Sequence, residues 1–199
     1  VKRYVPVGSR LLDIGCGTGL DAAHFAAQGF QVVATDWSPL MIERTRARLV
    51  DNSLKDRVSA RVLGAQDLRQ LRGECFDGIY SDLGPLNCAP DLAAVAEACA
   101  ALLKPQGVLI VSVIGRVCPW EWLYYTVRGD RARATLRRQR EGVPVSLNGQ
   151  RVWTRYYSPR EFYRAFERDF ELLHYRGLSV FVPPPYLHRA RFAAAYRLL

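Results

Sequence analysis

The chain has 199 residues, of which 49% are hydrophobic, and a formal net charge of +9 at pH 7. This length can bury a core without disulfides, and no apolar run reaches the roughly 18 residues that a membrane-spanning helix needs. The N-terminus lacks the apolar core of a signal peptide, and the five cysteines contain no C-x-x-C pair. We therefore expect a cytoplasmic domain with no transmembrane segment and no metal site.

Apolar runs typical of buried strands alternate with helical patterns along the first half of the chain. The strands are expected over residues 10–14, 30–35, 58–63, 76–81 and 107–113, and the helices over residues 20–28, 39–50 and 92–103. Such alternation is typical of a parallel sheet with helices on both of its faces.

The first of these strands ends in an acid and runs into three alternating glycines. The sequence Leu11-Leu-Asp-Ile-Gly-Cys-Gly-Thr-Gly19 places Gly15, Gly17 and Gly19 in the turn before the first helix. Glycine has no side chain and adopts positive φ, so a ligand can approach the backbone of such a turn closely. The spacing G-x-G-x-G matches the G-x-G-x-x-G of nicotinamide-binding proteins poorly.

This turn resembles the first motif of class I S-adenosylmethionine-dependent methyltransferases, in which a strand ends in D/E-x-G-x-G-x-G. Three later segments resemble the same family in order and spacing. They are the strand that ends at Asp36, the segment Gly64-Ala-Gln-Asp-Leu68 and the strand Cys75-Phe-Asp-Gly-Ile-Tyr-Ser81. These features cover roughly a hundred residues, and the chain is identified as a member of the small-molecule, type-11-like group of this family.

The resemblance implies that S-adenosylmethionine is the cofactor and S-adenosylhomocysteine the product. Asp36 is expected to accept hydrogen bonds from the ribose hydroxyls, a role that α/β folds give to an acid at this place. Asp67 is expected to receive the adenine amino group, and Trp37 and Met41 either line the adenine or pack internally. The expected cofactor-binding residues are Asp13, Gly15, Cys16, Gly17, Gly19, Asp36, Trp37, Met41, Ala65, Gln66, Asp67 and Ser81.

The resemblance also implies a doubly wound α/β fold. Its mostly parallel, seven-stranded sheet would have the order 3-2-1-4-5-7-6, with the last strand antiparallel. Residues 170–179 are expected to form the sixth strand and residues 191–199 the seventh, although the alanines of the latter also suit a helix. We expect one domain over residues 1–199, with residues 116–160 as a lid inserted between strands 5 and 6.

This insertion is basic and aromatic, with ten arginines against three acidic residues. In this fold it would stand at the carboxyl ends of the strands, where it would select the acceptor. Trp120, Arg155 and Tyr157 are expected to bind the substrate, because arginine can hold a carboxylate or phosphate through paired hydrogen bonds. The arginine-rich residues 128–140 form either a solvated lid helix or a face for RNA or an anionic membrane.

Methyl transfer from a sulfonium is an in-line displacement, so the enzyme must chiefly align the reacting atoms and exclude water. A general base is needed only where the acceptor carries a proton. Asp82, Asn87 and Tyr156 are the candidate catalytic residues, although Asp82 and Asn87 also suit a plain turn and Tyr156 suits internal packing. The loop after residue 81 is not the Asn/Asp-Pro-Pro-Tyr loop of enzymes that methylate exocyclic amines.

The sequence thus predicts a methyltransferase that acts on an oxygen or nitrogen atom of a small, acidic or hydrophobic acceptor. Two alternatives remain open at this point. One is an RNA methyltransferase that uses the arginine-rich insertion to clamp the phosphate backbone. The other is a non-catalytic protein that binds S-adenosylmethionine and serves as a regulatory or structural partner.

Overall fold

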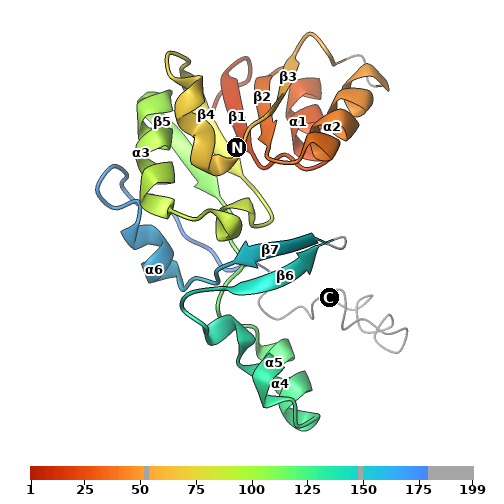
Figure 1. The fold of residues 1–199 in the computed structure, drawn as a ribbon. Helices are drawn as coiled ribbons and strands as arrows, with labels where there is room; N and C mark the ends of the chain where they lie inside the picture. Colours follow the sequence, from red (N-terminus) through yellow and green to blue (C-terminus); the bar gives the residue numbers. More distant parts are fainter. Residues whose placement is uncertain (52–53, 148–149, 179–199) are drawn as a thin grey trace. The chain divides into compact units, whose positions relative to one another are not determined.

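The computed structural model describes residues 1–51, 54–147 and 150–178 (Figure 1). These residues form two compact units. The first contains residues 1–114 and 159–171, and the second contains residues 115–158 together with the described residues from 172 onward. Each unit is described by itself.

The first unit is built on a parallel sheet of five strands. They are β1 (Arg10–Ile14), β2 (Gln31–Asp36), β3 (Val58–Val62), β4 (Phe76–Ser81) and β5 (Leu103–Val111). Their order is β3-β2-β1-β4-β5, so the first five positions of the predicted order are confirmed (Figure 1). In β1 at the centre, Leu11 and Leu12 point to opposite faces and are both fully buried, because helices cover the two sides.

The helices of this unit are α1 (Leu20–Ala27), α2 (Pro39–Asp51), α3 (Leu92–Leu102) and α6 (Pro159–Arg164), with the 3₁₀ turns η1 (Ala65–Leu71) and η2 (Pro85–Cys88). Helix α1 packs on β2, α2 packs on β2 and β3, and α3 packs on η1 and β5. Asp91 starts α3 by accepting hydrogen bonds from the backbone N–H groups of Ala93 and Ala94. Helix α6 begins at Pro159, whose fixed φ suits the first position of a helix.

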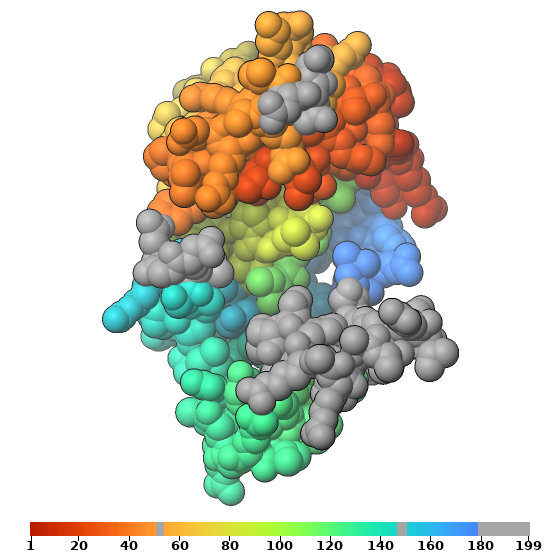
Figure 2. Space-filling model, turned by 90° about the vertical axis from the view of Figure 1, so that its right-hand side faces the viewer, coloured from red at the N-terminus to blue at the C-terminus, as the bar shows by residue number. Residues whose placement is uncertain are grey.

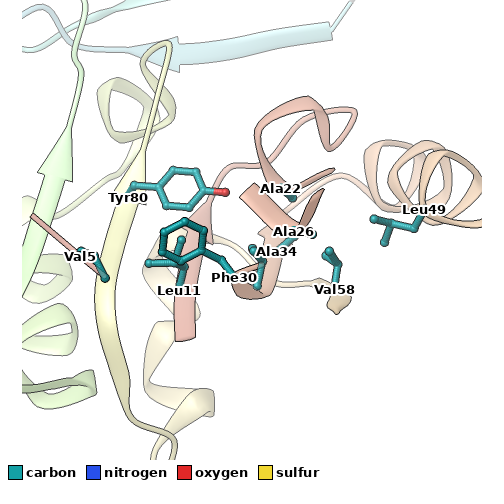
Figure 3. Close-up of a cluster of buried hydrophobic side chains, with 10 residues drawn as sticks. Val5, Leu11, Ala22, Ala26, Phe30, Ala34, Leu49, Val58 and Tyr80 are labelled. Carbon is teal, nitrogen blue, oxygen red and sulfur yellow. The ribbon is translucent and has the colours of Figure 1, made fainter. Parts of the chain in front are cut away.

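One cluster of the core lies between the sheet and α1 (Figure 3). Leu11, Ala34 and Tyr80 reach it from the sheet, while Ala22 and Ala26 reach it from α1. The cluster therefore packs the helix that follows the glycine turn onto the strands that flank this turn. It contains one polar atom of note, the hydroxyl oxygen of Tyr80 (Figure 3).

The prediction of a sixth strand at residues 170–179 is wrong for its described part, because residues 170–178 lie in no strand. The apolar residues that suggested a strand, such as Leu173 and Leu178, are 67% and 66% exposed and so bury no face against a neighbour. Residue 179 and the predicted seventh strand lie outside the described residues. The order 7-6 beyond β5 is therefore absent from the described part of the sheet.

The second unit contains α4 (Pro119–Val127), α5 (Arg131–Ala134), η3 (Leu136–Arg138) and an antiparallel pair, β6 (Val143–Leu147) and β7 (Gln150–Thr154). The arginine-rich run is broken into two short helical pieces rather than one helix over residues 128–140. Gly129 has a φ of 73°, and Asp130 caps α5 by accepting from the backbone N–H of Arg133. None of the helices among the described residues is long and apolar enough to cross a bilayer.

Candidate cofactor site

The glycine turn lies at the carboxyl edge of the sheet, between β1 and α1. The backbone N–H groups of Gly15 and Cys16 both donate to the Thr35 carbonyl of β2 at 2.8 Å. The Thr35 hydroxyl donates in turn to the Asp13 carbonyl at 2.9 Å, and the Ser81 hydroxyl of β4 donates to the Ile14 carbonyl at 2.8 Å. The turn is therefore fixed on both sides by the neighbouring strands.

The three glycines of the turn meet different surroundings. A Cβ atom on Gly15 would collide with the ring of Pro85, and one on Gly19 would lie 2.6 Å from Thr45 Cγ2. A Cβ atom on Gly17 would meet nothing within 4 Å. Gly15 and Gly19 thus serve the packing of the turn, whereas Gly17 leaves an open space that a ligand can use.

Asp36, the last residue of β2, contacts the glycine turn directly. Its carboxyl is only 7% exposed and accepts hydrogen bonds from the backbone N–H groups of Gly17 and Ser38, both at 2.9 Å. The acid at the end of β2 and the open glycine, which the sequence predicted from separate motifs, are therefore in direct contact.

Helix α2 also holds the turn, which the sequence reasoning missed. The hydroxyl of Thr45 donates to the Gly17 carbonyl at 3.0 Å, and Arg48 Nε donates to the Thr18 carbonyl at 2.8 Å. The only signal in the sequence is the spacing of three residues, which puts these two polar side chains on one helix face. Burial raises the pKa of the nearby Cys16 thiol to about 12, so Cys16 stays protonated.

Asp13 is the second acid of the site. Its side chain is 3% exposed, and its Oδ2 atom has no hydrogen-bond partner among the described residues. Burial raises the pKa of this carboxyl to about 8, and the charges of Asp21, Asp36 and Asp82 raise it further, while the Tyr80 hydroxyl lowers it. A buried acceptor of this kind suits a cationic group.

The remaining predicted cofactor residues follow the same edge of the sheet. Trp37 comes directly after β2 and is 57% exposed, and Met41 is half-buried in the first turn of α2. Ala65, Gln66 and Asp67 form the start of η1, just after β3, and Asp67 is half-buried. Their contact with a cofactor stays a prediction.

Two candidate catalytic residues lie in the loop after β4. Asp82 is exposed and accepts hydrogen bonds from the Ser112 hydroxyl and, at 2.8 Å, from the backbone N–H of Leu83. Asn87 is 1% exposed and binds the backbone of Ile114 twice, donating at 3.0 Å and accepting at 2.7 Å. Asp82 therefore faces solvent at the site, whereas Asn87 ties η2 to the end of the sheet.

The other predicted residues belong to the second unit. Tyr156 and Tyr157 are buried, with the Arg137 guanidinium 5.0 Å from the first ring and the Arg155 guanidinium 5.7 Å from the second. Trp120 is half-buried in α4. Because these residues lie in a separate unit, their grouping with the glycine turn stays a prediction.

Comparison with known proteins finds a family match for the segment that contains the glycine turn. Residues 11–107 match the family model described as "Methyltransferase domain". The chain is 36% identical over 114 residues to the "Ubiquinone biosynthesis O-methyltransferase" of Xanthomonas axonopodis pv. citri, covering 57% of this chain and 46% of that protein. It is 38% identical over 117 residues to the protein of the same name from Xylella fastidiosa, covering 58% and 46%. The chain thus spans about half the length of the curated relatives it matches.

The fold is also found among solved structures. One from Listeria monocytogenes, assigned as an S-adenosylmethionine dependent methyltransferase, matches with a TM-score of 0.64 and 17% identity, over 84% of this chain and 77% of that chain. At this identity the match shows the fold alone.

Proposed function

We propose that this chain, whose residues 11–107 form a class I S-adenosylmethionine-dependent methyltransferase domain, transfers a methyl group to a small acceptor. The observation that carries the proposal is the geometry at the glycine turn, where the buried carboxyl of Asp36 contacts the backbone of the open Gly17. A turn that was only a structural connection would need neither the open space nor the buried acid.

The residues present fit this cofactor. Asp36 is proposed to bind the ribose hydroxyls, Gly17 leaves room for a ligand at the backbone, and Asp13 offers a buried, unpartnered oxygen for a positive charge. Further along the edge, Asp67 with its neighbours Ala65 and Gln66 is proposed to bind the adenine, together with Trp37 and Met41. When bound, S-adenosylmethionine supplies a sulfonium-activated methyl group for in-line displacement.

The chain's own contribution is to position the acceptor and to exclude water. Asp82, exposed in the loop after β4, is proposed to orient an acceptor hydroxyl and to take its proton. The Ser112 hydroxyl and the Leu83 N–H hold the Asp82 carboxylate by hydrogen bonds. Asn87 is proposed to act indirectly, by fixing η2 beside this loop.

The acceptor is proposed to be a small molecule that is methylated on oxygen or nitrogen. Two relatives named "Ubiquinone biosynthesis O-methyltransferase" support an oxygen atom as the methylated atom. Residues 116–160 are proposed to be the lid of a single methyltransferase domain, with Trp120, Arg155 and Tyr157 binding the acceptor and Tyr156 as a further catalytic residue. Neither an RNA substrate nor a purely non-catalytic role is favoured by the comparisons.

Calorimetric titration with S-adenosylmethionine and S-adenosylhomocysteine tests the cofactor site. We expect wild type to bind both, Asp36→Ala to lose binding at least tenfold, and Asp56→Ala, which removes an exposed acid elsewhere, to bind as wild type does. Failure of folded wild type to bind either ligand would refute the proposal.

The transfer step is tested by release of S-adenosylhomocysteine in the presence of hydroxyl- or amine-bearing small molecules. Turnover with any of them excludes the non-catalytic role. A bulk RNA titration at low and moderate salt runs in parallel. Binding of RNA that falls steeply with salt, without turnover of small acceptors, would favour the RNA methyltransferase instead.

A further inference from the structure

Thr45 of α2 is a fully buried polar residue that contacts most of the glycine turn. Its side chain is 0% exposed. Its hydroxyl donates to the Gly17 carbonyl at 3.0 Å and lies 3.7 Å from Sγ of Cys16. Its methyl group fills the space beside Gly19, where an added Cβ atom would lie 2.6 Å from Thr45 Cγ2. One side chain of a separate helix therefore packs along the turn.

The Thr45 hydroxyl leaves its own helix to make this contact. A threonine hydroxyl within a helix commonly bonds the carbonyl four residues before it, as Thr135 does with the Arg131 carbonyl at 2.9 Å. Thr45 instead binds a carbonyl that lies 28 residues away in the chain. Because a buried hydroxyl without a partner is costly, a turn that moved the Gly17 carbonyl away from Thr45 would be disfavoured.

The backbone of Gly17 is held from two sides. Its N–H donates to the Asp36 carboxyl at 2.9 Å, while its carbonyl accepts from Thr45. The next carbonyl along the chain, that of Thr18, accepts from Arg48 Nε at 2.8 Å. Strand β2 and helix α2 thus fix consecutive peptide groups of the turn.

These contacts close a ring through the acid that ends β2. Asp36 accepts from the N–H of Ser38, the residue directly before α2, and α2 returns to the turn through Thr45. Glycine has more conformational freedom than any other residue, so a turn with three glycines does not keep one shape by itself. The ring restrains the backbone of Gly17 and leaves open the space where its Cβ atom would be.

We propose that Thr45, assisted by Arg48, is a positioning residue for the cofactor, which holds the Gly17 backbone so that the open side of the turn and the Asp36 carboxyl face the same ligand. The inference rests on the proposed function, which assigns S-adenosylmethionine to this turn. Losing the hydroxyl lowers the fraction of molecules whose turn can bind, and affinity falls by that fraction.

Two substitutions separate the hydroxyl of Thr45 from its bulk. Thr45→Val removes the hydroxyl at nearly equal volume, and Thr45→Ser keeps the hydroxyl but removes the methyl group beside Gly19. In calorimetric titration with S-adenosylhomocysteine, Thr45→Val should bind about fivefold more weakly than wild type, the factor that one hydrogen bond typically represents. Thr45→Ser should bind as wild type does. The melting temperature should fall in both variants, so a general loss of stability does not explain the difference.

Amide hydrogen exchange, followed by NMR on the protein without ligand, reports on the turn itself. The Gly17 N–H, which donates to Asp36, should exchange about fivefold faster in Thr45→Val than in wild type. In Thr45→Ser its exchange should stay as in wild type. This readout does not depend on the cofactor.

Matched controls come from residues that make similar contacts elsewhere. Thr135→Val removes a hydroxyl that bonds within its own helix, in the second unit. Helix α2 forms part of the surface drawn in orange in Figure 2, and its exposed Arg46 binds the Ala60 carbonyl of β3 at 2.8 Å. Thr135→Val and Arg46→Gln should both bind S-adenosylhomocysteine as wild type does, whereas Arg48→Gln should bind more weakly.

Wild-type affinity and wild-type exchange in Thr45→Val would overturn the inference. An equal loss of affinity in Thr45→Ser would also overturn it, because the bulk of Thr45 would then explain the effect. If Thr45→Val fails to fold, as judged by circular dichroism, the comparison of Arg48→Gln with Arg46→Gln decides. Failure of folded wild type to bind S-adenosylhomocysteine would instead refute the proposed function.

Discussion

Leu83 and Gln106 are the two residues other than glycine that have a positive φ in the described chain, at 60° and 63°. Leu83 is 85% exposed and lies between Asp82 and Gly84 in the candidate site. Gln106 lies within β5 (Leu103–Val111), between Leu103 and Val108, where the pairing with β4 is irregular. The strained backbone of Leu83 therefore lies next to the proposed catalytic residue Asp82, whereas the strained backbone of Gln106 lies next to none of the predicted site residues.

Replacing Gln106 by glycine should stabilise the protein. An L-residue in the left-handed region costs about 1 kcal/mol, of which the larger unfolded-state entropy of glycine offsets a part. Gln106→Gly should thus raise the free energy of unfolding by about 0.5 kcal/mol, measured by urea denaturation. Gln139→Gly, at an ordinary φ of −67°, should lower it by about the same amount. Loss of stability in both variants would contradict the strain argument.

Two alanine substitutions in the glycine turn should separate folding from binding. Gly17→Ala adds a methyl group where nothing lies within 4 Å, so the protein should fold with a cost of about 1 kcal/mol for its positive φ. The methyl group enters the space proposed for the cofactor, and affinity for S-adenosylhomocysteine should fall at least tenfold. Gly15→Ala collides with Pro85 and should cost about 3 kcal/mol or more in thermal unfolding. Unchanged affinity of Gly17→Ala would place the cofactor elsewhere.

At the scale of elements, side chains that hydrogen-bond backbone groups connect the loops and helices along the described edge of the sheet. Asn87 connects η2 to Ile114 beyond β5, while Thr45 and Arg48 connect α2 to the glycine turn. Each contact joins segments that are 27 to 30 residues apart in the chain. The loops of the site are thus positioned by contacts with distant elements rather than by their own turns.

Asn87→Ala should therefore act on stability. It removes both hydrogen bonds to the part-buried N–H and carbonyl of Ile114, which should lower the free energy of unfolding by about 2 kcal/mol, measured by urea denaturation. Affinity for S-adenosylhomocysteine, measured on folded protein, should fall less than tenfold. Asp91→Ala removes only an exposed cap of α3 and should cost about 1 kcal/mol. A loss of turnover in Asn87→Ala with unchanged stability would make Asn87 a catalytic residue instead.

For the whole molecule, the sequence predicts the parts that rest on local patterns. The five parallel strands and the glycine turn are predicted by apolar runs and by a glycine spacing, which are patterns within short segments of the sequence. The β6–β7 pair was missed although Asn148-Gly149 separates two apolar-alternating runs, a common hairpin signal. The contacts of Thr45 and Arg48 have no signal beyond their spacing of three residues. The apolar residues between 172 and 178 suggest a strand, but these residues pair with no strand among the described residues.

The buried acid at the centre of the sheet should also set how stability depends on pH. The pKa of Asp13 is about 8 in the folded protein against 3.8 for an unperturbed carboxyl, so the folded state binds the proton more tightly. Its contribution to stability is full below the lower value and is lost as pH rises toward 8, by up to about 1.4 kcal/mol per pH unit. Glu74 and Asp77 have the opposite effect. Hydrogen bonds from Arg61 and Arg10 lower the pKa of Glu74, and hydrogen bonds from Lys104 and the Arg10 N–H lower the pKa of Asp77. The contribution of these two acids to stability is therefore lost only as the pH falls into the acid range.

Urea denaturation of wild type between pH 5 and 9 should accordingly show falling stability up to about pH 8, the folded pKa of Asp13. Asp13→Asn keeps the shape of the side chain but carries no charge, so its profile should be flat over this range and its stability should exceed that of wild type at pH 8. Asp56→Asn, an exposed acid outside the site, should follow the wild-type curve. A wild-type profile as flat as that of Asp13→Asn would mean that Asp13 is ionised throughout this range, which would contradict a pKa raised by burial.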